Sequence, residues 1–149
     1  MPELPAEIQR EIDLVCTDSR SDIAGVALAA LPEGKVGWLY VSGSRNGRYR
    51  RIIVKPGRGI AGLTLRSGRP VKLDDAEPDL AKLRQNSPLM LAEQLHAAMA
   101  VPLRSADGQA VGVLMVGRRS PHVYTPEDLK SAESAAAKLR SLLLAEPSV

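Results

Sequence analysis

At the middle of this 149-residue chain lies the sequence Gly57-Arg58-Gly59-Ile60-Ala61-Gly62-Leu63-Thr64-Leu65-Arg66-Ser67-Gly68. Its first glycines lead into a short apolar segment, and Gly68 is placed to stop it, so the pattern predicts a short helix with a glycine at its C-terminal end. A helix that starts at Gly59-Ile60-Ala61 exposes unpaired N–H donors and the positive end of its dipole, which favours an anion. The same glycines also suit a tight turn in a domain that binds nothing.

The segments around this helix have the periodicities of an α/β domain. Leu4, Ile8, Ile12 and Val15 are spaced to share one helix face. Asp107-Gly108 is the strongest hairpin signal of the chain, and Thr125-Pro126-Glu127-Asp128 is typical of a helix start. The sequence predicts helices over 3 to about 16, 59–67, 80 to about 95 with a break at Pro88, and from 126 onward, and strands over 24–30, 35–42, 70–74, 99–104 and 110–118. Between the second strand and the central helix lies a basic loop with a short β-branched run at 51–55.

Length and composition predict one globular domain over 1–149, with a core at about 20–145 and an N-terminal helix at about 3–18. Charged residues make up 25% and hydrophobic residues 44% of the chain, as in ordinary globular proteins. No apolar run approaches the roughly 20 residues of a membrane-spanning helix. The start of the chain does not have the pattern of a secretory signal, and a lone Cys16 suits a reducing compartment, so we expect a cytoplasmic protein.

The positive charge is concentrated in one part of the chain. The stretch between Glu33 and Asp74 contains no acidic residue. Such a stretch raises the local potential for anions if its side chains lie near a pocket, and it is an ordinary solvated surface if they do not. Half of the basic residues lie there: Lys35, Arg45, Arg48, Arg50, Arg51, Lys55, Arg58, Arg66, Arg69 and Lys72.

Motifs spread over residues 20 to 145 resemble those of the GAF domain family. The central helix continues into Ser67-Gly68-x-Pro70 and Asp74-Asp75; later come Val101-Pro102-Leu103, Gly108 with Val111-Gly112-Val113-Leu114, and Tyr124-Thr125-x-Glu127-Asp128-Leu129. The resemblance implies an α/β (α+β), GAF/PAS-like fold, in which a six-stranded antiparallel sheet carries helices on one face and a ligand pocket on the other.

Within that family, Arg48-Tyr49-Arg50-Arg51-Ile52-Ile53-Val54-Lys55-Pro56-Gly57, with Trp38 before it, is similar to small stand-alone nitrate receptors of two-component systems. That resemblance implies a nitrate-like anion held by backbone N–H groups beside a tryptophan, and a sensor histidine kinase as partner. By position, the ligand-binding residues would be Trp38, Ile60, Ala61, Met90 and Leu91. Alternation along the strand would put Val36, Tyr40 and Ser42 on the same side as Trp38. Trp38 as an ordinary core residue is an equal alternative.

Other functions find less support in the residues. Some free-standing GAF proteins reduce methionine sulfoxide with several cysteines, whereas this chain has one, so we expect no enzyme and no catalytic residues. His96 and His122 have no neighbours at ligand spacing, and no metal or cofactor is expected. With no Phe, one Trp and three Tyr, a base-stacking surface for nucleic acid is not supported.

The remaining alternatives are an organic ligand, or an interaction module whose pocket is vestigial. The apolar stripes of the first and last helices would suit a homodimer through these terminal helices.

Overall fold

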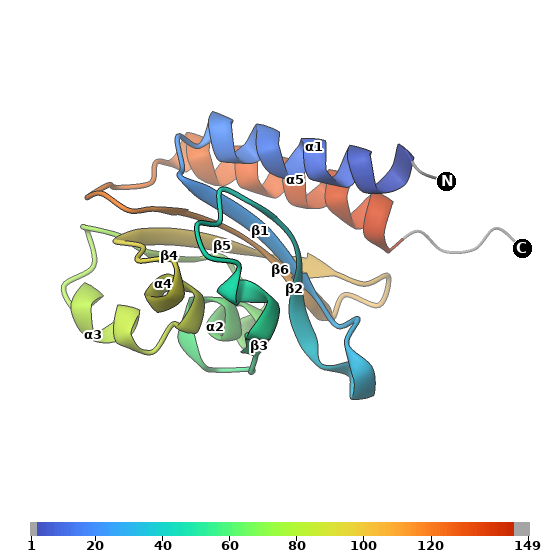
Figure 1. Ribbon diagram of the computed structural model, residues 1–149, viewed down its shortest axis with the longest axis horizontal. Coiled ribbons are helices and arrows are strands. Elements are labelled where there is room, and N and C mark those ends of the chain that lie inside the picture. Colours follow the sequence, from blue (N-terminus) through green and yellow to red (C-terminus); the bar gives the residue numbers. More distant parts are fainter. Residues whose placement is uncertain (1–2, 145–149) are drawn as a thin grey trace, which may run out of the picture.

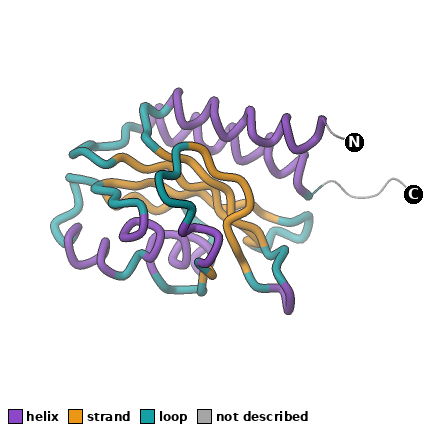
Figure 2. The backbone as a smooth tube through the Cα atoms, in the orientation of Figure 1, coloured by secondary structure: helices purple, strands orange, loops and turns teal. Residues whose placement is uncertain are grey.

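The computed structural model describes residues 3–144 and has a six-stranded antiparallel sheet between two helical layers (Figures 1 and 2). The strand order is β3-β2-β1-β6-β5-β4. The strands are β1 (Ile23–Leu28), β2 (Val36–Ser42), β3 (Ile53–Val54), β4 (Val71–Leu73), β5 (Ala97–Arg104) and β6 (Ala110–Arg118), and the helices are α1 (Glu3–Asp18), α2 (Gly59–Ser67), α3 (Leu80–Gln85), α4 (Pro88–Ala92) and α5 (Pro126–Leu143), with short 3-10 turns η1 (Pro32–Gly34) and η2 (Arg48–Arg51).

Alternation along the central strands divides the core into two clusters. Ala24 and Val26 of β1 face α1 and α5, whereas Ile23 and Ala27 face α2, α3 and α4. The long helices α1 and α5 lie side by side and antiparallel on the first face, and the three short helices cover the second (Figure 1). The six-stranded antiparallel sheet expected from the resemblance is therefore confirmed.

Most predicted elements are present near their predicted limits. Helix α2 begins at Gly59 and ends at Gly68, whose φ of 67° is the left-handed conformation expected of a C-terminal glycine. The helical region after residue 80 is broken at Pro88, which becomes the first residue of α4. Thr125 and Asp128 form a reciprocal capping box at the start of α5. The predicted domain limits, 1 and 149, lie outside the described residues.

The β-branched run at 51–55 forms the short strand β3 only at Ile53–Val54, and residues 48–51 form the turn η2. One prediction about the second strand was wrong. Tyr40 does not lie on the side of Trp38: it packs with α1 and α5, whereas Trp38 belongs to the opposite cluster. The cause is a register shift in which Val26 pairs with Tyr40 and Ala27 with Trp38, so that one extra residue of β2 reverses the alternation.

Helix α2 lies unusually close to the loop before it. A Cβ atom on Gly62 would come within 2.1 Å of the Lys55 carbonyl oxygen, and the Gly57 N–H donates to the Gly62 carbonyl at 2.8 Å. On its other side, a Cβ on Gly59 would lie 2.7 Å from the Asn86 carbonyl oxygen. Glycine at both positions is what allows three backbone segments to meet at the start of α2.

Among residues 3–144, no helix is both long enough and apolar enough to cross a lipid bilayer. The elements instead bury their apolar faces against one another, in the two clusters on either side of the sheet.

Replacing Gly62 with alanine tests this close packing. Alanine improves helix propensity by about 1 kcal/mol, but the clash with the Lys55 carbonyl forces a backbone shift that costs more, so we expect a net loss of about 2 kcal/mol. Urea unfolding measures the change. In the control, Gly34→Ala, the side chain meets open space and only the φ of 72° is strained, so the loss is about 1 kcal/mol. A G62A protein as stable as the wild type would contradict the packing described.

Candidate functional site

A small cavity lies between the sheet and the start of helix α2, with a volume of about 20 Å³. Its walls come from β2, β3, the loop between β3 and α2, the first turn of α2, the start of α4, and β6. The space is enough for about one water-sized species. Three segments that are far apart in the sequence, around residues 38, 60 and 88, therefore meet at one point.

Trp38 supplies a wall and a hydrogen-bond donor. The side chain is 5% exposed, and its buried Nε1–H has no hydrogen-bond partner among the described residues. The Cε3 edge of the indole faces β1, where a Cβ on Gly25 would lie 3.3 Å from it. Nε1 lies on the opposite edge of the ring. A buried donor without a partner costs about 1–3 kcal/mol, and an acceptor within hydrogen-bond reach of Nε1 would remove that cost.

The first turn of α2 supplies further donors. The first N–H groups of any helix have no partner within the helix, and the residue that precedes α2, Arg58, provides no side-chain cap. The Ile60 N–H instead donates to the Ser87 Oγ, at 2.9 Å. Ile60 and Ala61, at 1% and 8% exposure, both line the cavity. This turn thus presents the positive end of a nine-residue helix to the cavity.

The charges near the cavity are positive. Lys55 and Arg58 are among its lining residues, and no acidic residue is. The basic residues at 45, 48, 50, 51, 66 and 69 have exposed side chains. Most side chains of the basic segment therefore lie on the solvated surface away from the cavity, and two of them, Lys55 and Arg58, also line it. This distribution attracts anions without burying an unpaired positive charge.

The model of the GAF domain matches residues 8–143 of the chain. The chain belongs to the GAF domain family. No curated protein matches it significantly.

Several solved structures are similar to this chain in fold and sequence. A mutant of NreA, altered in the nitrate binding site, from Staphylococcus aureus is 29% identical, with a TM-score of 0.67 over 80% of this chain and 91% of that one. Hypothetical protein SA1058 from S. aureus is 30% identical, with a TM-score of 0.64 over 78% and 99%. A type II free methionine-R-sulfoxide reductase from Thermoplasma acidophilum, 17% identical with a TM-score of 0.71 over 95% and 92%, shares the fold.

The structure brings three of the five predicted ligand-binding residues together. Trp38, Ile60 and Ala61 all line the cavity. Met90 is fully buried in the apolar cluster that contains Trp38 and Ile60, without being a lining residue. Leu91 lies outside the group: its side chain is 53% exposed and its N–H donates to the Ser87 carbonyl. The binding roles of all five remain predictions.

The sequence analysis did not predict that Ser87, Lys55 and Arg58 line the cavity. Ser87 before Pro88 carries a visible signal, because serine and proline are typical of the first positions of a helix. Nothing in the sequence indicates, however, that the Ser87 hydroxyl faces a different helix. Lys55 and Arg58 are exposed like the other basic residues of the acid-free stretch, and only the fold of the loop places them among the residues that line the cavity.

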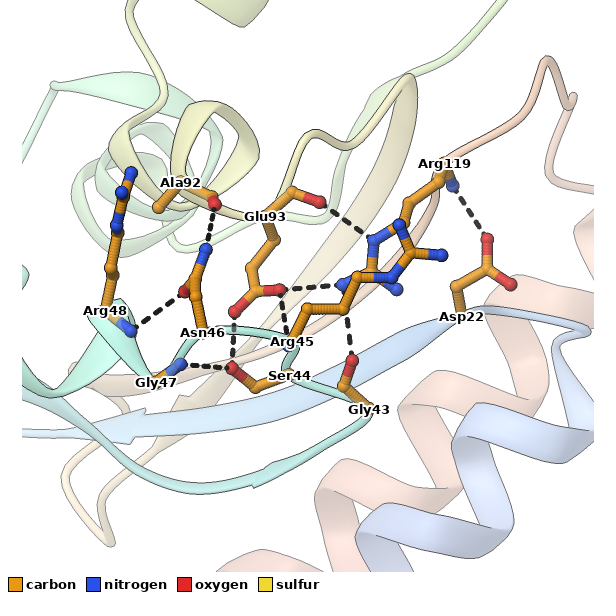
Figure 3. Close-up of polar contacts among 10 residues, drawn as sticks. All are labelled: Asp22, Gly43, Ser44, Arg45, Asn46, Gly47, Arg48, Ala92, Glu93 and Arg119. Carbon is orange, nitrogen blue, oxygen red and sulfur yellow. Dashed lines mark hydrogen bonds and ion pairs between the residues drawn. The ribbon is translucent and has the colours of Figure 1, made fainter.

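At the C-terminal end of α4, a buried ion pair connects three loops (Figure 3). The Glu93 carboxylate, just after α4, has a fully buried side chain and accepts from Arg119 Nη2 at 2.7 Å. It also accepts from the Arg45 N–H, at 3.1 Å, and from the Ser44 hydroxyl. Arg119 further donates to the carbonyls of Glu93 and Gly43. The loop after β2 is thereby held against the end of α4.

Asn46 and Asp22 extend this network in two directions. The Asn46 side-chain amide donates to the Ala92 carbonyl at 2.8 Å, which fixes the basic loop to the last residue of α4. The backbone N–H of Arg119 donates to the Asp22 carboxylate at 2.8 Å, and Asp22 follows α1 directly before β1 (Figure 3). Hydrogen bonds thus run without interruption from a helix that lines the cavity to the turn after α1.

The reactive side chains lie away from the cavity. Cys16, on α1, packs in the apolar cluster between the sheet and the two long helices. Its thiol donates to the Ser21 carbonyl at 3.3 Å, and burial raises its pKa to about 11. His96 is paired with Asp75 at 2.7 Å, and that hydrogen bond lowers the pKa of the Asp75 carboxyl. Within residues 3–144, no three His, Cys, Asp or Glu side chains are grouped to hold a metal ion.

Replacing Glu93 with alanine tests the buried ion pair. It leaves the Arg119 guanidinium, whose side chain is only 12% exposed, without its anion, so we expect a loss of about 4 kcal/mol in urea unfolding. The control is Glu33→Ala, which breaks an exposed pair with Lys35 and costs less than about 0.5 kcal/mol. The double change of Glu93 and Arg119 to methionine should recover much of the loss. Equal effects of E93A and E33A would refute a stabilising role.

Proposed function

We propose that the protein is a sensor that binds a small, weakly hydrated anion such as nitrate in the cavity between Trp38 and helix α2. The observation that carries the proposal is that Trp38, whose buried Nε1–H has no partner among the described residues, lines the same cavity as Ile60 and Ala61 of α2. The anion accepts from Trp38 and from the N–H groups of Ile60 and Ala61, and Arg58 and Lys55 attract it. The similarity to NreA, whose structure concerns a nitrate binding site, supports nitrate as the first anion to test.

The size of the cavity favours an inorganic anion over an organic ligand. Sites for organic molecules usually measure about 300–1,000 Å³, whereas this cavity measures about 20 Å³. Larger hollows, of about 230–400 Å³, lie along α5 on the other face of the sheet. Their polar lining residues are side chains such as Glu7, Arg10 and Arg140, and no buried, unpaired polar atom among the described residues faces them.

We further propose that the protein binds its ligand without catalysis. The methionine sulfoxide reductases among the structural neighbours share its fold at 14–17% identity. Reduction by thiols requires an attacking cysteine and a resolving one. The single cysteine of this chain is buried on the opposite face of the sheet from the cavity, with a raised pKa that disfavours the reactive thiolate.

Titration with anions tests the proposal directly. Trp38 is the only tryptophan, so its fluorescence reports on the cavity. At constant ionic strength we expect saturable changes with nitrate and nitrite, weaker changes with chloride, and none with sulfate, which is too large and too strongly hydrated. Calorimetry should give the same dissociation constants. If no anion changes the fluorescence, the heat or the melting temperature, the proposal fails.

The variant Trp38→Phe keeps an aromatic wall but removes the donor. Since a hydrogen bond to a charged group contributes about 1.5–3 kcal/mol, nitrate affinity should fall at least about tenfold in calorimetry. Without nitrate, its stability should change little, because lost packing is offset by removal of a buried unpaired donor. Tyr49→Phe removes a hydroxyl from a residue that does not line the cavity and should bind as the wild type does. Unchanged affinity in W38F would place the anion elsewhere.

For the output of the sensor we propose a homodimer through α1 and α5 and a sensor histidine kinase as partner. Leu14 of α1 is 47% exposed and lines a hollow that α1 and α5 share, together with acidic Glu11 and Asp18 of α1 and basic Lys130 and Lys138 of α5. Apolar and complementary charged groups of this kind suit a second copy of the same helix pair. Light scattering at micromolar concentration should give a dimer, and Leu14→Glu should give a monomer; a monomeric wild type would exclude this contact.

A further inference from the structure

The Ser87 hydroxyl does not serve the helix that it precedes. Ser87 is the N-cap residue of α4, and a serine there ordinarily accepts from a backbone N–H of its own helix, yet it makes no such bond. Its Oγ instead accepts from the Ile60 N–H of α2 at 2.9 Å and donates to the Leu83 carbonyl at 3.2 Å. Ser87 therefore caps a different helix, one that lies 27 residues earlier in the chain.

The hydroxyl is held in this position by close packing. Ser87 is 1% exposed, and a Cβ on Gly59 would lie 2.8 Å from the Ser87 Cα and 3.1 Å from its Oγ. Ser87 also lines the cavity together with Trp38 and Ile60. Its oxygen thus occupies the acceptor position at a donor that faces the cavity.

One N–H cannot make two full hydrogen bonds in the same direction, so an anion that takes the Ile60 N–H has to displace Ser87. Nitrate has four heavy atoms, whereas the cavity has room for about one water molecule, so some lining group has to move. Rotation about χ1 moves the hydroxyl without shifting the packed Ser87 backbone; it breaks the bond to the Leu83 carbonyl but lets the oxygen accept from the N–H groups of its own helix.

We propose that the Ser87 hydroxyl competes with the anion for the Ile60 N–H. By this competition it lowers the affinity of the site for anions and transmits anion binding to α4. The inference rests on the proposed anion site. When the anion accepts from the Ile60 N–H, the Ser87 hydroxyl turns to cap α4. The other end of α4 is followed by Glu93, which Arg119 holds by hydrogen bonds to its carbonyl and carboxylate. Ser87 is then a positioning residue that selects anions strong enough to displace it, and not a ligand.

The experiment compares nitrate binding to the wild type, Ser87→Ala and Thr64→Val by calorimetry. Ser87→Ala removes the competitor, so nitrate should bind about fivefold more tightly, which is the ratio that one neutral hydrogen bond produces. Thr64→Val is the matched control: it removes a buried hydroxyl of α2 that donates to the Ile60 carbonyl, and it should leave the affinity unchanged. Equal or weaker binding in S87A overturns the inference.

Tighter nitrate binding in S87A could come from loss of the competing hydroxyl or from the space that the smaller side chain leaves. Amide hydrogen exchange at Ile60 distinguishes these two causes. Without anion, this amide should be protected in the wild type and in T64V, and should exchange faster in S87A. Saturating nitrate should restore its protection in S87A. If the Ile60 amide of S87A stays protected without anion, Ser87 is not its acceptor and the inference is wrong. If the wild type binds no anion at all, the proposed function fails, a result that the wild-type titration reveals by itself.

Discussion

The contact of backbone with backbone at the start of helix α2 supports the cavity. Gly62 lies against the loop that carries Lys55, and Gly59 lies against the turn at Asn86 and Ser87. A Cβ atom at either position would lie 2.1 Å or 2.7 Å from a facing carbonyl oxygen, so these segments would have to move apart. The positions of α2 and α4 on this face of the sheet depend on that contact.

Electrostatics act differently at the two neighbouring polar sites. At the cavity, the donors are backbone N–H groups, a helix dipole and one indole, and the nearest full charges, on Lys55 and Arg58, are solvated. Such an arrangement attracts an anion without the cost of burying a charged side chain. At Glu93 and Arg119 two charges are buried, and each is compensated by the other and by further hydrogen bonds. The first arrangement suits a ligand that comes and goes, and the second suits a permanent connection between loops.

That connection gives the proposed sensor a physical route to its long helices. Ser87 and Glu93 stand at the two ends of α4, and Arg119 joins Glu93 to Asp22, in the turn between α1 and β1. A small rotation of α4 would therefore be transmitted to the end of α1 through these hydrogen bonds. Coupling of this kind requires two arrangements of similar free energy, and the two positions proposed for the Ser87 hydroxyl, on α2 and on α4, would supply them.

The local signals in the sequence were sufficient for most elements and for the family. Gly59 and Gly68 delimit α2, Pro88 divides α3 from α4, and Thr125 with Asp128 starts α5, because each acts through bonds to its near neighbours in the chain. The sequence by itself predicted the helices and most of the strands, and its resemblance to the GAF family implied the six-stranded sheet and pointed to Trp38, Ile60, Ala61, Met90 and Leu91. The side of β2 on which Tyr40 lies, the exposure of Leu91 and the helix that Ser87 caps were decided only by the tertiary structure. A bulge and a hydrogen bond between helices depend on partners far away in the chain, and no local pattern encodes them.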